Sequence, residues 1–208
     1  AAGRAIESNG RTVGQLGTVA QMPDGRVMAL AVLRRDLAAD AVQRGTYRHY
    51  MQKEIFDQPR AVAETLEGRI GADHVLPNIF GVGADDLLRQ VRQVHIVACG
   101  TSYHAGLVAR YQMEELAGIP CTVEVASEYR YRSPVVPADT MFVAISQSGE
   151  TADTLAALRH AKASGYLATL AICNVPASSI VREAGLVLMT RAGLEIGVAA
   201  TKTFVSQV

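Results

Sequence analysis

The sequence predicts an α/β fold in which a doubly wound parallel sheet forms a sandwich between helices and is preceded by a helical segment. Two observations in the second half of the chain lead to this fold class. Short runs such as 94–98 and 141–145 are almost continuously apolar, and stretches with helical periodicity separate these runs. Strands that are apolar on both faces and alternate with helices are typical of a parallel sheet covered on both sides.

The elements of this domain are expected in a regular order that begins near residues 85–94. The expected helices are 85–93, 103–116, 151–164 and 178–183, and the expected strands are 94–98, 120–126, 141–145, 168–173 and 186–189. The sheet domain is therefore assigned to residues 85–208.

A helical linker is predicted for residues 47–84. The apolar residues Met51, Ile55, Val62 and Leu66 recur at helical spacing, and Pro59 predicts a break into two short helices because proline removes a backbone donor. Residues 71–83 are expected to form a loop within this linker.

The first 46 residues are poorly defined, because they are rich in Gly, Ala and Arg and show little periodicity. We interpret them as a linker or as the remnant of a preceding domain. Within them, a hairpin is predicted where residues 15–22 meet residues 27–32 across the turn Pro23-Asp24-Gly25.

Composition argues against two classes of partner. Lys and Arg number 20 and Asp and Glu number 20, so no net charge gathers nucleic acid or an anionic membrane. The apolar runs are far shorter than the roughly 20 residues that cross a bilayer, and no signal pattern begins the chain. We expect a cytoplasmic protein whose three cysteines are reduced and bind no metal.

The hexapeptide Ser146-Gln147-Ser148-Gly149-Glu150-Thr151 lies between an expected strand and an expected helix. The first N–H groups of a helix lack partners and carry partial positive charge, so an anion is favoured there without Lys or Arg. Ser and Thr are also ordinary helix caps, but a cap needs one hydroxyl and this turn supplies three. The turn is therefore predicted to bind a phosphate group.

A second loop, Cys99-Gly100-Thr101-Ser102, follows the strand 94–98 in the same way. In open parallel sheets, ligands bind beyond the carboxyl ends of strands where the strand order reverses. If both loops meet there, Thr101, Ser102, Ser146, Gln147, Ser148 and Thr151 converge on a pocket that suits a sugar phosphate. The alternative for Thr101 and Ser102 is helix capping, and Cys99 is expected to be a packed thiol.

Other candidate motifs indicate structural roles. Gly81-Val82-Gly83 lacks the third glycine of a dinucleotide loop, and Tyr129-Arg130-Tyr131-Arg132 is better explained as a local structural or interface segment than as an RNA contact. Glu195 is a candidate acid or base, but a carboxylate that flanks a helix is the safer interpretation.

Several long motifs in order resemble the glucosamine-6-phosphate synthase family, the isomerising glutamine–fructose-6-phosphate aminotransferases. The motifs are Tyr47 to Ile55, Cys99 to Ser102, Ser127 to Arg132, Ser146 to Leu155, Ala171 to Val175 and Glu195 to Thr203. The resemblance covers roughly residues 47–208 and implies the linker and first sugar isomerase (SIS) domain, a flavodoxin-like or Rossmann-like sandwich, of an enzyme that makes glucosamine 6-phosphate from fructose 6-phosphate and glutamine.

By that resemblance, Ser146, Gln147, Ser148 and Thr151 hold the phosphate, Thr101 and Ser102 lie near the sugar, and Val198 lines the same pocket. Ala200 stands where a Ser is expected in some relatives. The resemblance implies no metal and no organic cofactor.

The family's glutaminase begins with a cysteine, whereas this chain begins with Ala1. The second isomerase domain, with its glutamate base and Schiff-base lysine, is expected beyond Val208, so Lys202 is given no catalytic role and the isolated chain is expected to be inactive. A homodimer or association with the missing domains is expected. The alternative is a non-catalytic phosphosugar sensor in a regulator, which the absence of a basic recognition helix in residues 47–70 disfavours.

Overall fold

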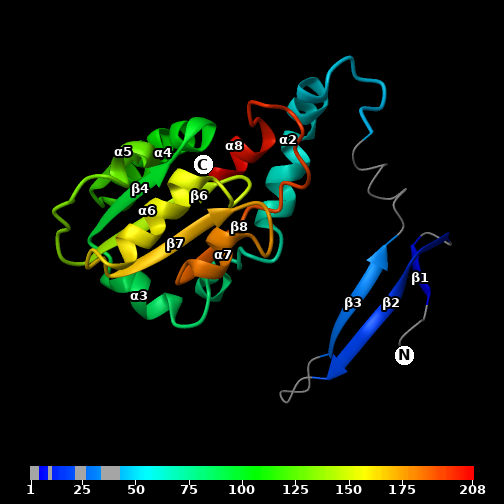
Figure 1. The fold of residues 1–208 in the computed structure, drawn as a ribbon, viewed down its shortest axis with the longest axis horizontal. Helices are drawn as coiled ribbons and strands as arrows, with labels where there is room; N and C mark the ends of the chain where they lie inside the picture. Colours follow the sequence, from blue (N-terminus) through cyan, green and yellow to red (C-terminus); the bar gives the residue numbers. More distant parts are fainter. Residues whose placement is uncertain (1–4, 9–10, 22–26, 34–42) are drawn as a thin grey trace. The chain divides into compact units, whose positions relative to one another are not determined.

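The computed structural model describes residues 5–8, 11–21, 27–33 and 43–208. These residues belong to two compact units, Ala1–Thr46 and Tyr47–Val208. The strands of the first unit, drawn in blue in Figure 1, form an antiparallel sheet of order β1-β2-β3. Its strands are β1 (Ala5–Ser8), β2 (Arg11–Gln21) and β3 (Val27–Leu33).

The hairpin predicted in the first unit corresponds to the pairing of β2 with β3, in which Gln21 pairs with Val27. The predicted turn Pro23-Asp24-Gly25 lies outside the described residues. The strand β1 was not predicted, because its four residues are too few to show a period of two.

The second unit contains a five-stranded sheet in which every neighbouring pair is parallel, with the order β5-β4-β6-β7-β8. Its strands are β4 (Gln93–Ala98), β5 (Cys121–Val125), β6 (Thr140–Ser146), β7 (Ala168–Cys173) and β8 (Leu186–Met189). This sheet confirms the predicted doubly wound α/β fold.

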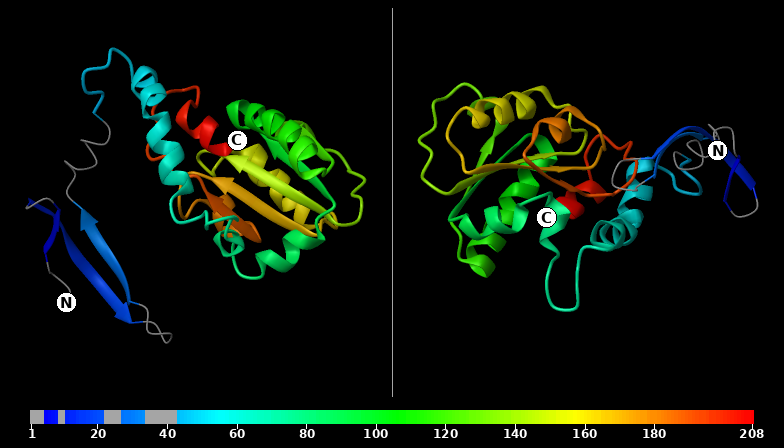
Figure 2. Two further views of the ribbon diagram at one scale, coloured as in Figure 1. Left: turned by 180° about the vertical axis from the view of Figure 1, so that it is seen from behind. Right: turned by 90° about the horizontal axis from the view of Figure 1, so that it is seen from below.

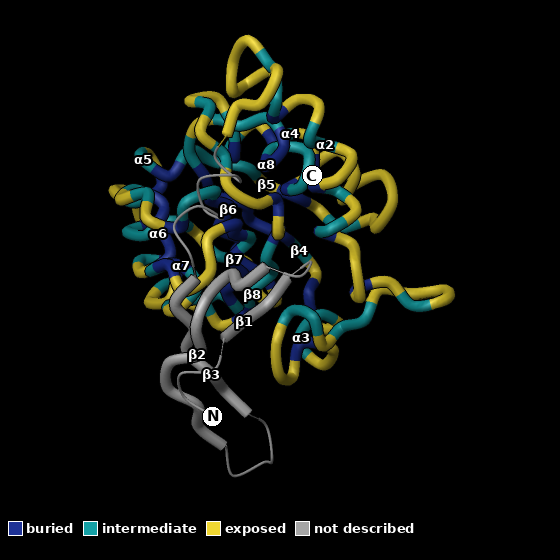
Figure 3. Tube along the Cα trace, turned by 90° about the vertical axis from the view of Figure 1, so that its right-hand side faces the viewer, coloured by how far each residue is buried: buried dark blue, intermediate teal, exposed yellow. Residues whose placement is uncertain are grey.

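Helices cover both faces of the sheet, as Figures 1 and 2 show. One core cluster joins the sheet to α3 (Ala84–Gln90) and α4 (Gly100–Gln112). The other joins it to α5 (Ala126–Tyr129), α6 (Ala152–Lys162) and α7 (Ser179–Glu183). The sheet is therefore the middle layer of a sandwich, and its strands are largely buried (Figure 3).

Strand β6 shows why the apolar runs are continuous. All seven of its residues are buried. Val143 and Ile145 pack in the cluster beside α3 and α4, whereas Phe142 and Ala144 pack in the cluster beside α5 and α6. Alternate side chains of a strand point to opposite faces, so a strand covered on both faces needs apolar residues at every position.

The segment before the sheet forms one helix rather than two. Helix α2 (Tyr50–Leu66) runs through Pro59, which corrects the predicted break. Pro59 and Ile55, whose carbonyl loses its helical donor, both lie on the exposed side of α2, where water can hydrogen-bond the freed carbonyl. The opposite side buries Ala61 and Thr65, and this packing overrides the local preference.

Three further elements complete the unit. The predicted loop 71–83 contains a short 3-10 helix, η1 (Pro77–Phe80). The helix expected to reach residue 116 changes after Gln112 into a π-helical turn, η2 (Met113–Ala117). Helix α8 (Lys202–Gln207), which was not predicted, packs against α2 and α4.

Candidate functional site

The strand order places both predicted loops at one edge of the sheet. Strand β4 pairs with β5 on one side and with β6 on the other, so the direction of winding reverses between β4 and β6. The loop 99–102 follows β4, and the turn 146–151 begins at the last residue of β6. This is the topological switch point at which open α/β sheets bind ligands.

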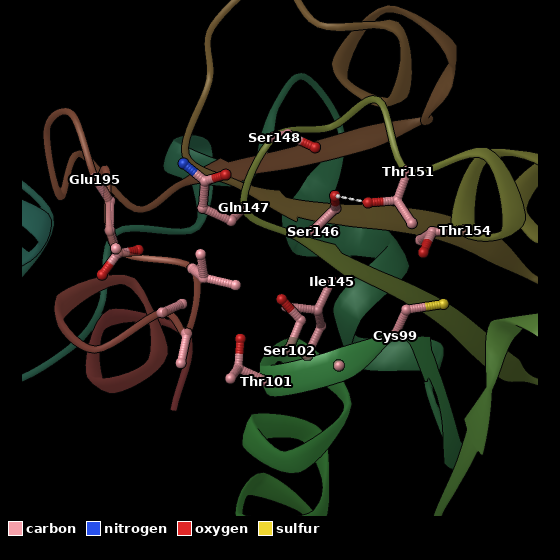
Figure 4. A pocket seen from close by; sticks show the side chains of 15 residues that line it. Cys99, Thr101, Ser102, Ile145, Ser146, Gln147, Ser148, Thr151, Thr154 and Glu195 are labelled. Atoms are coloured by element: carbon pink, nitrogen blue, oxygen red, sulfur yellow. Dashed lines mark hydrogen bonds between the residues drawn. The ribbon is translucent and has the colours of Figure 1, made fainter. Parts of the chain in front are cut away.

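A cavity of about 460 Å³ opens at this switch point. All seven residues that the sequence analysis selected for the site line it. Figure 4 shows Thr101 and Ser102 on one side of the cavity and Ser146, Gln147, Ser148 and Thr151 on the other. The seventh selected residue is Val198, and the remaining lining residues are Cys99, Gly100, Ile145, Thr154, Glu195, Gly197, Ala199 and Ala200.

The turn after β6 is organised by its own serine hydroxyls. Ser146 is buried, and its Oγ accepts a hydrogen bond from the N–H of Gly149 at 3.0 Å and lies 3.4 Å from Thr151 Oγ1. Ser148 Oγ, which is less buried, accepts the N–H of Glu150 at 3.2 Å. Ser146 therefore shapes the turn, whereas Ser148 is more open to a ligand.

Two helices begin at the cavity with incompletely capped N-termini. Helix α4 begins after Cys99 and α6 begins after Thr151, and neither capping side chain hydrogen-bonds its own helix. The capping alternative therefore does not account for the hydroxyl of Thr151. The two helix dipoles add partial positive charge to a cavity whose lining contains no Lys, Arg or His.

The other candidate segments have structural partners. Arg130 Nη1 lies 2.6 Å from Asp153 Oδ1, and Arg132 Nε donates to Glu124 Oε2 at 2.8 Å. Tyr129 is fully buried in the core. The segment Tyr129–Arg132 therefore packs α5 against its neighbours.

Glu195 caps a helix, as the sequence analysis favoured. Its Oε1 accepts the N–H groups of Thr201 at 2.7 Å and Lys202 at 3.0 Å, at the start of α8. In Figure 4 the side chain stands at the edge of the cavity, away from Ser146 and Thr151. Oε1 is thus committed to the backbone of the segment that leads into α8, whereas Oε2 is buried without a hydrogen-bond partner among the described residues.

Sequence reasoning missed Thr154 as a lining residue. Thr154 is 1% exposed, and its Oγ1 has no hydrogen-bond partner among the described residues. It lies three residues after Thr151 on α6, so the two share one face of the helix. That spacing is a signal that a search of the first helical turn would have found.

The cysteines are free thiols, and burial raises the pKa of Cys121 to about 11. No group of three or more His, Cys, Asp or Glu side chains that could hold a metal ion occurs within the described parts of the chain. Among those same residues, no helix is both long and apolar enough to cross a membrane.

Comparisons with known proteins agree with the fold. The chain is 61% identical over 184 residues to the glutamine–fructose-6-phosphate aminotransferase (isomerizing) of Pseudomonas syringae pv. tomato, which covers 88% of this chain and 30% of that protein. It is 66% identical over 169 residues to the corresponding protein of Pseudomonas putida, which covers 81% of this chain and 28% of that protein. The chain therefore spans less than one third of the length of these relatives.

A solved structure, the C-terminal domain of glucosamine-fructose-6-phosphate aminotransferase from Francisella tularensis, superimposes with a TM-score of 0.76 and is 49% identical. The superposition covers 79% of this chain and 46% of that chain. The family model described as SIS domain matches residues 87–208. Because this match spans more than half of the chain, the protein belongs to the SIS domain family.

Proposed function

We propose that this chain is the phosphosugar-binding first isomerase domain of an enzyme that makes glucosamine 6-phosphate from fructose 6-phosphate and glutamine. One observation carries the proposal: the hydroxyl-rich turn 146–151 and the loop 99–102 meet in one cavity at the switch point. The names of the relatives supply the substrate class, since they are fructose-6-phosphate aminotransferases.

In this proposal, the turn after β6 holds the phosphate. Ser148, Thr151 and the free N–H groups at the start of α6 surround one end of the cavity and offer neutral donors. Gln147, Thr101 and the loop 195–200 lie around the rest of the cavity, where sugar hydroxyls would be paired. Ser102 and Ser146 are buried and support these contacts, and Val198 forms part of the rim.

We assign binding and orientation to these residues, and no proton-transfer step. The single carboxylate of the lining, that of Glu195, holds the start of α8. We propose that turnover in the longer enzyme uses residues of a second isomerase domain beyond Val208, without metal or organic cofactor. A non-catalytic sensor is disfavoured, because the relatives with 61% and 66% identity are aminotransferases.

We further propose an origin for residues 1–46, an association with other chains or domains, and a cellular location. The similarity to the Pseudomonas syringae protein spans more residues than the unit Tyr47–Val208 contains, which supports a linker or the end of a glutaminase domain for residues 1–46. An apolar cavity of about 450 Å³ between α2, α3, α4 and the sheet supports a homodimer or association with further domains. A cytoplasmic location is proposed from the similarity to the Pseudomonas syringae aminotransferase.

Isothermal titration of the chain with fructose 6-phosphate and glucosamine 6-phosphate tests the binding proposal. Saturable binding of both is expected, with weaker binding of inorganic phosphate and none of unphosphorylated glucosamine, because the turn provides the anion site. A folded chain, verified by circular dichroism, that binds neither hexose phosphate at millimolar concentration would contradict the proposal.

A further inference from the structure

One wall of the candidate site is an irregular segment, residues 195–200, which forms neither helix nor strand. Glu195, Gly197, Val198, Ala199 and Ala200 all line the cavity. Side chains and backbone on such a segment keep a fixed position only if other elements hold them. Residues 195–200 therefore need contacts from other elements to keep their position at the cavity.

The first half of this segment is held by a carboxylate from α2. Glu54 is 3% exposed, and its Oε1 accepts the N–H of Ile196 at 2.5 Å and that of Gly197 at 3.1 Å. The second oxygen, Oε2, also lies 3.1 Å from the nitrogen of Gly197. A buried carboxylate therefore binds two consecutive backbone donors of the cavity wall.

The space around Glu54 fits this arrangement closely. A Cβ atom at position 197 would overlap Glu54 Oε2, so the backbone approaches the carboxylate as near as a glycine allows. Gly197 is not among the glycines with positive φ, so its backbone conformation is one that other residues adopt. The need for glycine here arises from the contact with Glu54.

A second, longer contact from α2 reaches the first residue of α8, just beyond the segment. Asp57 lies three residues after Glu54, and hence on the same side of α2. Its Oδ2 is 3.8 Å from the Nζ of Lys202, a 2% exposed residue that begins α8. Glu195 holds the start of α8 from within the segment itself.

We propose that Glu54 is a positioning residue of the site: it holds residues 196–197 so that the wall 197–200 faces the sugar portion of a bound phosphosugar. This inference rests on the proposed function. It gives α2, which lies outside the matched family region 87–208, a part in ligand binding that acts through the cavity wall. Because the turn 146–151 makes its own hydrogen bonds, loss of Glu54 leaves the phosphate end of the site in place.

The test compares Glu54→Ala, Glu54→Gln and a matched control, Glu64→Ala, which removes a half-exposed carboxylate of the same helix that pairs with Arg60. Affinities for glucosamine 6-phosphate and for inorganic phosphate are measured by titration. Hydrogen exchange of the Ile196 and Gly197 amides is followed by NMR without ligand.

Glu54→Ala is expected to weaken glucosamine 6-phosphate binding by about tenfold, the factor that corresponds to roughly 1.4 kcal/mol, and to leave phosphate binding within about twofold. The two amides lose protection in the same variant. Glu54→Gln, which keeps one acceptor oxygen, recovers part of both effects, and Glu64→Ala matches the wild type. Partial unfolding alone would instead lower both affinities together.

If Glu54→Ala fails to fold, Gly197→Ala disturbs the same contact from the side of the loop and is expected to give the same selective loss. Equal glucosamine 6-phosphate affinity in the wild type and in a folded Glu54→Ala, or unchanged amide protection, would overturn the inference. A wild-type chain that binds no hexose phosphate would overturn the proposed function and the ligand step of this inference, while the exchange data still decide whether Glu54 holds the loop.

Discussion

The hydroxyl of Ser178 occupies the space that a side chain at Gly149 would need. A Cβ at position 149 would overlap Ser178 Oγ and Cβ, and the φ angle of Gly149 is +68°, a region that favours glycine. The backbone oxygen of Gly149 also accepts the N–H of Ile180 at 3.1 Å. The turn 146–151 thus packs directly against the start of α7.

Gly149→Ala is therefore expected to lower the free energy of unfolding by about 2–4 kcal/mol, from backbone strain plus overlap, and to abolish phosphosugar binding. Gly165→Ala is the control, because Gly165 has a φ of +83° and open space around its Cβ position. The control is expected to lose only about 1–2 kcal/mol. Urea unfolding measures both, and equal losses would show that the packing against Ser178 is unimportant.

The two serines of the turn are expected to separate stability from binding. Ser146→Ala leaves the N–H of buried Gly149 without its acceptor and is expected to lower the free energy of unfolding by about 1–3 kcal/mol. Ser148→Ala is expected to change stability by less than about 0.5 kcal/mol but to weaken glucosamine 6-phosphate binding by about tenfold. Chemical unfolding and titration calorimetry on both variants check the separation; the same profile for both would argue against it.

Glu195 is expected to act on stability through α8. Glu195→Ala removes the acceptor of the Thr201 and Lys202 N–H groups and is expected to lower the free energy of unfolding by about 1–2 kcal/mol. Glu115→Ala, which removes an exposed carboxylate, is expected to change it by less than about 0.5 kcal/mol. An unaltered unfolding midpoint for Glu195→Ala would refute the capping role.

Stability is also expected to depend on pH through His95, a 7% exposed residue of β4. Its Nδ1 lies 2.7 Å from Tyr166 Oη, and its Nε2 lies 2.9 Å from Glu124 Oε1. Burial, aided by the positive charge of Arg132, lowers the pKa of His95 below its usual value, although Glu124 opposes the shift. The folded chain therefore binds this proton less readily than the unfolded chain does.

This difference in proton binding makes the free energy of unfolding decrease as the pH falls. Above the unfolded pKa of about 6.5, His95 is neutral in both states and its contribution to stability is constant. As the pH falls through 6.5 towards the lower folded pKa, the unfolded state gains the proton first, and the free energy of unfolding decreases. Urea unfolding is measured between about pH 7.5 and 5, in steps of about half a unit around the unfolded pKa. The free energy of unfolding is expected to depend less steeply on pH in His95→Gln than in the wild type. The control His104→Gln, which changes an exposed histidine, is expected to keep the wild-type slope.

Much of the fold follows from local sequence alone. The strand Ala168–Cys173 and the strand Leu186–Met189 have the bounds that their mainly apolar runs predict, because strands of a sheet covered by helices are rich in apolar residues. The turn Ser146–Thr151 was also recognisable, since hydroxyls and a glycine follow a buried strand. Pro59 was misleading, because an exposed helix position tolerates the single lost hydrogen bond.

The sequence by itself determined the fold class, the two loops and the residue types that suit a phosphosugar. Only the tertiary structure decided which distant residues support them: Ser178 beneath Gly149, and Glu54 against Gly197, more than 140 residues away along the chain. Such pairs leave no periodic signal, because they depend on where packing places α7 and α2 rather than on local preference. The physical reason is that hydrogen bonds and steric fit act between neighbours in space, which a single sequence does not identify.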